Sequence, residues 1–273
     1  MSISFDRHRA QLHCESILNC KSLEEWSLAD FKNLRLDKIQ ASVLTSELKE
    51  DAKDLYFKGL LSLFEALSSI NNRLFSWATI KIYYSLYYFL RCTMAVSGVA
   101  LIRQKSLFYL KAIDGESPVS KGNKKYNSDH SGTINYFIDL FKGSDILLTQ
   151  LIDTTNAYDW LMNKREQVNY RERTFNEPGY SEFWDYIASE VIEGNLEKII
   201  EEYIKDPFIL CFQEEHAILA IPLKRALLTK KKLEEEKINI ALTREQRKLL
   251  LKLLPVDSRD LVHLTESNFD SDT

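Results

Sequence analysis

Arginines gather in one short segment of the chain, at Arg165, Arg171 and Arg173. A guanidinium is planar and always charged, so it can hold two phosphate oxygens at once and stabilise the charge that builds up when a phosphodiester is cleaved. If the segment is helical, a step of about 100° per residue places Arg165, Asn169 and Arg173 near one face. Tyr170 falls about 140° from Arg165, so the two can serve one site only across a cleft or a dimer seam.

A group that could move a proton for the same chemistry is His130, because the unperturbed pKa of imidazole is about 6.5. The phenol of tyrosine, with a reference pKa of about 10, is a poor base at neutral pH. His130 follows a long loop, 114–129, which carries Lys121, Lys124 and Lys125. Long loops in compact domains are commonly functional or mobile. The ordinary alternative is that His130 anchors the start of a helix and that the lysines are solvated.

Composition excludes several other classes of protein. The chain has 273 residues, a net charge of -4 and 45% hydrophobic residues, which is typical of a globular protein without a wholly basic surface. Its 4 cysteines form no CxxC pair, so we expect free thiols, no metal site and no disulfide. No nucleotide-binding glycine loop, nucleophile elbow or HExxH is present, and we expect no cofactor. The start lacks a signal-peptide core and no apolar run is long enough to cross a membrane, which predicts a cytoplasmic protein.

Helices are the expected elements, since only 8 glycines and 5 prolines punctuate the chain. Apolar residues at steps of three and four predict a helix over 47–70, and the most apolar segment predicts a buried central helix over 74–97 that ends at Gly98. Its tyrosines (Tyr83, Tyr84, Tyr87 and Tyr88) fit a core better than a base-stacking platform. Further helices are expected over 132–141, 145–174 and 180–203. The predicted fold class is all-α.

The ends of the chain are expected to differ from this core. Residues 1–46 read as an N-terminal helical arm, with a capping box at Ser22 and Glu25. The boundary at Asp206-Pro207 opens a C-terminal extension, 206–265. There, apolar runs at 208–212 and 217–221 are compatible with a small β-hairpin, Pro222 can open a helix, and Thr243 with Gln246 forms a second capping box. The polar tail, 266–273, is expected to be disordered.

Three segments, in this order, resemble the HEPN superfamily, in particular the small HEPN proteins of toxin–antitoxin and antiviral defence loci. The first is IYYSLYYFLR at 82–91, with Ile82 where alanine is common. The second is His130-Ser131-Gly132 with Phe137 downstream. The third is REQVNY at 165–170, in which Asn169 replaces an acidic residue. The resemblance covers residues from about 47 to 205.

This resemblance implies an antiparallel helical bundle that forms a homodimer. Many members are metal-independent endoribonucleases with an R-x(4–6)-H motif at the dimer cleft. In this chain the motif reads R-x4-Y, from Arg165 to Tyr170; a literal match at Arg7 and His13 lies outside the matched segment. The resemblance implies that Arg165 holds phosphate, Tyr170 orients it and His130 handles the proton. Charge and position near these residues add a wider set of candidates for RNA or phosphate contacts: Asn169, Arg171, Arg173, Lys124 and Lys125.

Two functions follow as hypotheses. The first is an RNA-directed effector, a metal-independent endoribonuclease of a bacterial defence or toxin–antitoxin system, controlled by a separate partner protein. The second is a catalytically inactive HEPN subunit that holds RNA, a nucleotide or a partner protein in a multi-protein defence complex. The missing histidine favours the second, whereas Arg165 and His130 together favour the first. A basic stretch, 224–248, has nine Lys or Arg against four Glu; it suits an RNA backbone, an acidic partner or simply a solvated helix.

Overall fold

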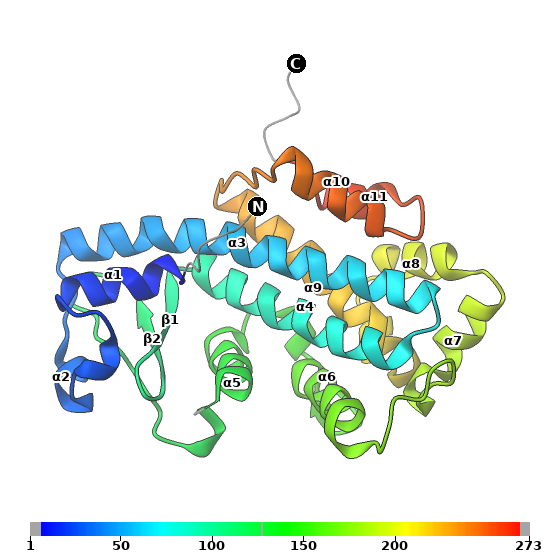
Figure 1. Ribbon diagram of the computed structural model, residues 1–273, viewed down its shortest axis with the longest axis horizontal. Coiled ribbons are helices and arrows are strands. Elements are labelled where there is room, and N and C mark those ends of the chain that lie inside the picture. Colours follow the sequence, from blue (N-terminus) through cyan, green and yellow to red (C-terminus); the bar gives the residue numbers. More distant parts are fainter. Residues whose placement is uncertain (1–6, 127, 268–273) are drawn as a thin grey trace. The chain divides into compact units, whose positions relative to one another are not determined.

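Helices dominate the structure, as the shortage of glycine and proline predicts. The computed structural model describes residues 7–126 and 128–267. Helix makes up 65% of it and strand 6%, with 11 α-helices and two two-stranded sheets among the described residues, so the prediction of a largely helical fold is confirmed (Figure 1). The chain divides into two compact units, Met1–Leu55 with Leu90–Leu140 and Tyr56–Phe89 with Phe141–Thr273. Of the predicted disordered tail, 268–273 lies outside the described residues.

The first unit combines short helices with a β-hairpin. Its elements are α1 (Arg9–Ile17), α2 (Leu28–Asn33), the start of α3 (Lys38–Asn71), the end of α4 (Phe75–Val96), β1 (Val99–Arg103), β2 (Leu107–Lys111) and α5 (Asp129–Phe141). Phe31 and Phe108 meet edge to face in its core, with ring centroids 5.0 Å apart. Gly98, at φ 74°, follows the end of α4 as predicted, because a residue without Cβ adopts this left-handed conformation at little cost.

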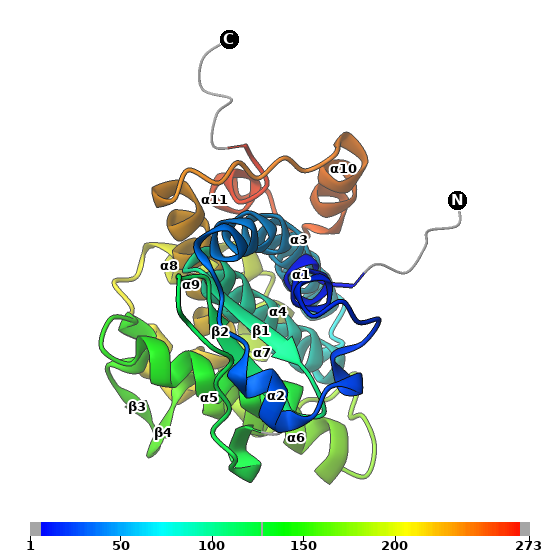
Figure 2. The same ribbon diagram turned by 90° about the vertical axis from the view of Figure 1, so that its left-hand side faces the viewer.

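The hairpin β1–β2 was not predicted; its sequence indicated only a short apolar segment, 99–113. The strands pair antiparallel from Val99 opposite Lys111 to Arg103 opposite Leu107 (Figure 2). The side-chain amide of Gln11 in α1 continues the pairing, since it accepts from the N–H of Arg103 and donates to its carbonyl, each at 2.9 Å. The turn contains Gln104, Lys105 and Ser106 in place of the glycine or asparagine that marks most tight hairpins, so the sequence carried no turn signal.

The second unit contains the remaining parts of α3 and α4 and the C-terminal half of the chain. Its other elements are β3 (Leu151–Ile152), β4 (Thr155–Asn156), α6 (Ala157–Glu166), a π-helical turn (Gln167–Arg171), α7 (Asp185–Ile192), α8 (Leu196–Lys205), α9 (Glu214–Glu235), α10 (Arg244–Leu253) and α11 (Arg259–His263). Within it α3 and α4 approach closely, because a Cβ on Gly59 would lie 2.5 Å from the ring of Phe89. Trp184 packs on Phe75 of α4 and donates to Thr79 at 2.9 Å.

Three predicted elements of the second unit are wrong. The small β-hairpin expected within 208–221 is a short 3-10 turn followed by α9, and Pro222 lies inside this helix instead of opening one. Most of α9 is buried, so its apolar residues show no periodicity that separates helix from strand. The helix expected over 145–174 begins only at Ala157, after the β3–β4 hairpin, and the helix expected over 180–203 is interrupted at Gly194, at φ 84°.

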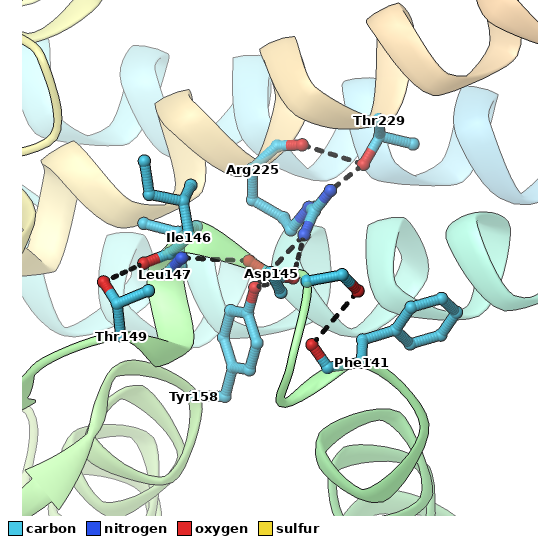
Figure 3. A network of polar contacts seen from close by, with 9 residues as sticks. Phe141, Asp145, Ile146, Leu147, Thr149, Tyr158, Arg225 and Thr229 are labelled. Atoms are coloured by element: carbon cyan, nitrogen blue, oxygen red, sulfur yellow. Dashed lines mark hydrogen bonds and ion pairs between the residues drawn. The ribbon is translucent and has the colours of Figure 1, made fainter.

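A buried ion network connects α9 to α6 (Figure 3). Arg225 Nη1 lies 2.5 Å from Asp145 Oδ2 and donates to the Tyr158 hydroxyl at 3.1 Å, while Tyr158 donates to Asp145 at 2.7 Å. Asp145 also accepts from the N–H of Leu147 at 2.9 Å, and Arg225 Nε donates to Thr229. Burial raises the pKa of Tyr158 well above its ordinary value, so the phenol stays a donor. The charges are therefore buried together with the hydrogen bonds that satisfy them.

We expect Asp145→Asn to lower the free energy of unfolding by about 3–5 kcal/mol, because it leaves the Arg225 guanidinium buried without its counterion. Urea unfolding followed by far-ultraviolet circular dichroism measures the loss. As a control, Lys205→Ala removes an exposed ion pair with Glu201 and should change stability by less than about 0.5 kcal/mol. A loss below about 1 kcal/mol for Asp145→Asn would contradict this account.

In the first unit, Asp51 caps the N-terminus of α1. Its carboxylate accepts from the backbone N–H of Arg9 at 2.8 Å and of Ala10 at 3.0 Å, and the imidazole of His8 lies 3.7 Å away. Burial acts to raise the pKa of Asp51, but the nearby imidazole of His8 and the hydrogen bonds from Ala10 and Arg9 outweigh it and the pKa is lowered. The carboxylate therefore stabilises the folded state in its charged form.

Asp51→Asn should lower the free energy of unfolding by about 1–2 kcal/mol at pH 7, as for loss of a helix cap. Because the folded-state pKa of Asp51 is lowered, this contribution is complete above the unfolded pKa of about 4 and is lost as the pH falls through the folded-state value. Urea unfolding at pH 7 and pH 3 should show the difference between wild type and variant shrinking at the lower pH. The control Asp54→Asn, at an exposed position of α3, the helix that also carries Asp51, should leave the free energy of unfolding close to wild type at both pH values. An equal loss at pH 7 and pH 3 for Asp51→Asn would show that the charged carboxylate does not stabilise the cap.

Candidate functional site

The candidate site is centred on Arg165, in the last turn of α6. Asn156 begins this helix by accepting from the N–H groups of Tyr158 at 3.1 Å and Asp159 at 3.0 Å. Tyr158, one residue into the helix, also belongs to the buried network with Arg225. The helix that carries Arg165 is thus fixed at its start by a cap and by a buried ion pair. A cation in the last turn is further favoured by the helix dipole.

Three phenol rings surround the guanidinium of Arg165. Its central carbon lies 4.9 Å from the ring centroid of Tyr170, 5.2 Å from that of Tyr83 and 6.0 Å from that of Tyr84. Tyr83 and Tyr84 project from the central helix α4. A cation over the faces of aromatic rings is stabilised by their quadrupoles, the more so when it is withdrawn from water. The prediction that these tyrosines belong to the core holds for Tyr83 and Tyr87, which are buried. Tyr83 is also one of the three rings that contact Arg165.

A π-helical turn brings Tyr170 to Arg165. Gln167–Arg171 forms this turn, in which hydrogen bonds join residues i and i+5, and Arg165 and Tyr170 are separated by that interval. Arg165 Nη2 donates to the Tyr170 hydroxyl at 3.1 Å. The prediction that the two side chains diverge by about 140° is therefore wrong, because it assumed α-helical geometry throughout. Single π turns are rare and occur frequently at functional sites.

Arg165 is a buried cation without a counterion. Its residue is 7% exposed, and no carboxylate among the described residues lies within ion-pair distance of it. Its Nε is buried and has no hydrogen-bond partner among those residues. Burial raises the pKa of Tyr83, although the charge of Arg165 acts to lower it, so this phenol stays neutral. The rings offset only part of the cost of burying a charge, and an arriving anion would supply the rest.

Tyr170 gives this buried cation an exposed edge. The residue is 67% exposed, while the Arg165 beneath it is almost entirely covered. A hydroxyl that accepts from a guanidinium can donate its own proton outward, to a phosphate oxygen. The arrangement therefore presents a charge-assisted donor at the surface, backed by a fixed positive charge.

The other basic residues of the segment are placed differently from the prediction. Arg171 is exposed and lies 3.4 Å from Glu166, and Asn169 is half-buried. The chain leaves the helix at Glu172, which has an extended backbone, so the exposed Arg173 does not share a helix face with Arg165 and Asn169 as expected. These three residues remain near Arg165 in sequence, and none of them contacts its guanidinium among the described interactions.

Two glutamates that sequence reasoning missed hold the segment after the π turn. Glu172 accepts from Gln167 at 3.1 Å, Asn176 at 3.1 Å and Ser181 at 2.8 Å. Glu177 accepts from the backbone N–H of Ser76 at 2.8 Å and so caps α4. Because Glu177 and Ser76 are 101 positions apart, no local pattern could have indicated this cap.

The remaining predicted residues belong to the first unit. His130 is half-buried in the first turn of α5, and Lys124 and Lys125 are exposed on a 3-10 turn in the predicted loop. The backbone carbonyl of Lys125 accepts from Asn135 at 3.1 Å, which ties this turn to α5. The literal motif match is not a site, since Arg7 pairs with Glu15 at 2.7 Å and His13 contacts the carbonyl of Gln40.

No protein-family model, curated protein or solved structure shows significant similarity to this chain. Among the described residues there is no cluster of three side chains arranged to hold a metal ion, and no helix there is long and apolar enough to cross a membrane.

Arg165→Met tests whether the buried charge is retained for stability. Replacing a buried charge by an apolar side chain of similar length is often neutral or stabilising, so we expect the free energy of unfolding to stay within about 1 kcal/mol of wild type or to rise. Urea unfolding measures this, beside Asp145→Asn as the destabilised reference. A fall of about 3 kcal/mol or more in the free energy of unfolding would show that the charge of Arg165 stabilises the fold. The buried charge would then not be evidence for a ligand.

Proposed function

We propose that this chain is a HEPN-like, RNA-directed effector that binds an RNA phosphate at Arg165 and Tyr170. The observation that carries the proposal is the 3.1 Å contact between the Arg165 guanidinium and the Tyr170 hydroxyl. These are the two ends of the R-x4-Y segment that resembles the HEPN motif. The buried guanidinium without a counterion is the second support, because a phosphate would compensate it.

In this proposal the chain cleaves RNA without a metal ion. Such cleavage requires a base for the 2′-hydroxyl proton and positive charge beside the pentacoordinate phosphorus. Arg165 supplies the charge, Tyr170 donates a hydrogen bond to a phosphate oxygen, and His130 is the base. Asn169, Arg171, Arg173, Lys124 and Lys125 contact the RNA backbone. A homodimer, a separate regulatory partner and a cytoplasmic role in bacterial defence belong to the same proposal.

A second function is favoured by a specific observation. The side chains that contact the Arg165 guanidinium in the described part of the chain are phenols, and a phenol is a poor general base at neutral pH. A site of this composition binds phosphate without cleaving it. The chain would then be a catalytically inactive HEPN subunit that holds RNA or a nucleotide in a multi-protein complex.

The test is incubation of the purified protein with end-labelled tRNA and a single-stranded RNA in EDTA. We expect cleavage that leaves 2′,3′-cyclic phosphate ends, reduced by about 10²–10³-fold in Arg165→Met, as when one stabilising donor of a transition state is removed. Tyr170→Phe, which keeps the ring and removes the hydroxyl, should lose about tenfold. Tyr180→Phe, at another exposed tyrosine of the same segment, is the matched control.

The outcomes separate the two functions. RNA that is bound but left intact would establish the binding subunit, provided that Arg165→Met and Tyr170→Phe weaken binding and the control Tyr180→Phe does not. Cleavage that persists in His130→Ala would remove the imidazole from the mechanism. Wild-type protein that neither binds nor cleaves either RNA would overturn the proposal as a whole.

A further inference from the structure

A pocket outside the HEPN-like segment opens in the C-terminal extension. It has a volume of about 660 Å³ and is formed by the residues preceding α10, by one face of α10, and by Thr265 and Ser267 after α11. Volumes of this order are typical of small-molecule sites. Ser267 donates to the side chain of Asn239 at 2.7 Å, which joins two of the three walls.

The α10 wall of this pocket is basic. Arg244, Arg247, Lys248 and Leu251 follow one another at the intervals that place residues on a single helix face, and all four line the pocket. No acidic residue lines it in the part of the chain that the structure describes. The pocket therefore concentrates three positive charges in a protein whose net charge is -4.

These cations remain available to a ligand. Arg244 and Lys248 are exposed and form no ion pair within 4.0 Å among the described residues. Arg247 makes a long ion pair with Glu266, at 3.4 Å, and its buried Nε has no hydrogen-bond partner within 7–126 and 128–267. The N-terminus of α10 is already satisfied by the capping box of Thr243 and Gln246, so the charge of the pocket comes from side chains.

Other cations of the same basic stretch serve the fold. Lys224 donates to the carbonyls of Ile204 and Asp206, and Lys230 donates to the carbonyl of Glu266 at 2.6 Å. Burial lowers the pKa of both lysines. With Arg225 in its buried ion pair, these three residues cannot reach a ligand. The cations of this stretch that line the pocket are those of α10.

Part of the lining of the pocket is apolar. Ile240, Ala241 and Leu242 line it, and Leu251 continues this surface on α10. A site that joins an apolar wall to a cluster of guanidinium and ammonium groups suits a molecule with one flat or apolar part and a phosphorylated end.

We propose that this pocket binds a small phosphorylated ligand. Its phosphate groups bind Arg244, Arg247 and Lys248, and its apolar part packs on Ile240, Leu242 and Leu251. The inference goes beyond the proposed function, because the pocket lies in the extension and shares no residue with the Arg165 site. A ligand there would make the extension a sensor of a phosphorylated small molecule.

Isothermal titration calorimetry on the full chain tests this, with ATP, pyrophosphate and adenosine as probes. We expect ATP and pyrophosphate to bind saturably and adenosine to bind at least about tenfold more weakly, because it lacks the charged end. Lys248→Ala should weaken ATP binding by about tenfold, and Arg244→Ala with Lys248→Ala by about a hundredfold. Lys252→Ala removes an equally exposed cation of α10 that does not line the pocket, and should bind like wild type.

Other results of these titrations would contradict the proposed ligand. Absence of ATP and pyrophosphate binding, or equal weakening by Lys252→Ala and Lys248→Ala, would overturn the proposal. Binding of a single-stranded RNA that is lost in the double variant, without binding of either small probe, would assign the surface to RNA instead. ATP binding that Tyr170→Phe weakens and the Arg244→Ala, Lys248→Ala double variant leaves unchanged would place the nucleotide at the Arg165 site and overturn this inference. Its failure and the failure of the proposed RNA site are therefore distinguishable.

Discussion

The buried ion pair between Arg225 and Asp145 is the constraint on which the second unit depends. Two buried charges must lie close together and be hydrogen-bonded in one geometry, since a buried charge without its counterion would cost several kcal/mol. Tyr158 satisfies both partners and is itself part of α6. The pair thus fixes α6 against α9, elements that no local sequence pattern connects. The orientation of α6 then determines where Arg165 and the π turn lie.

The same unit contains a second buried arginine, and the contrast between the two separates structure from function. Arg225 has a carboxylate, a phenol and a hydroxyl for its guanidinium, whereas Arg165 has three phenol rings and one phenol hydroxyl. A charge kept for folding is compensated within the fold. The charge of Arg165 is only partly compensated in the folded chain, so an external anion is its natural partner.

Part of the fold could be predicted because some signals are local. The capping box of Thr243 and Gln246 forms as predicted, and Gly98 follows the end of α4 in the left-handed conformation. The rest depends on tertiary context. Helix α9 contains Pro222 at a buried position, and at the β1–β2 turn, which has no glycine, Gln104 is buried and donates to the carbonyl of Trp26. Neither arrangement leaves a periodic pattern in the sequence.

For the candidate sites, residue types were predictable and geometry was not. The sequence identified Arg165 and Tyr170 but placed them on different faces, because the change from α to π hydrogen bonding is decided by packing and not by composition. The basic stretch 224–248 shows the same limit. The sequence does not distinguish the cations of this stretch from one another. In the structure, Lys224 and Lys230 are buried and donate to backbone carbonyls, whereas Lys248 lines a pocket. Charge becomes a functional argument only once the fold has decided which cations are already neutralised.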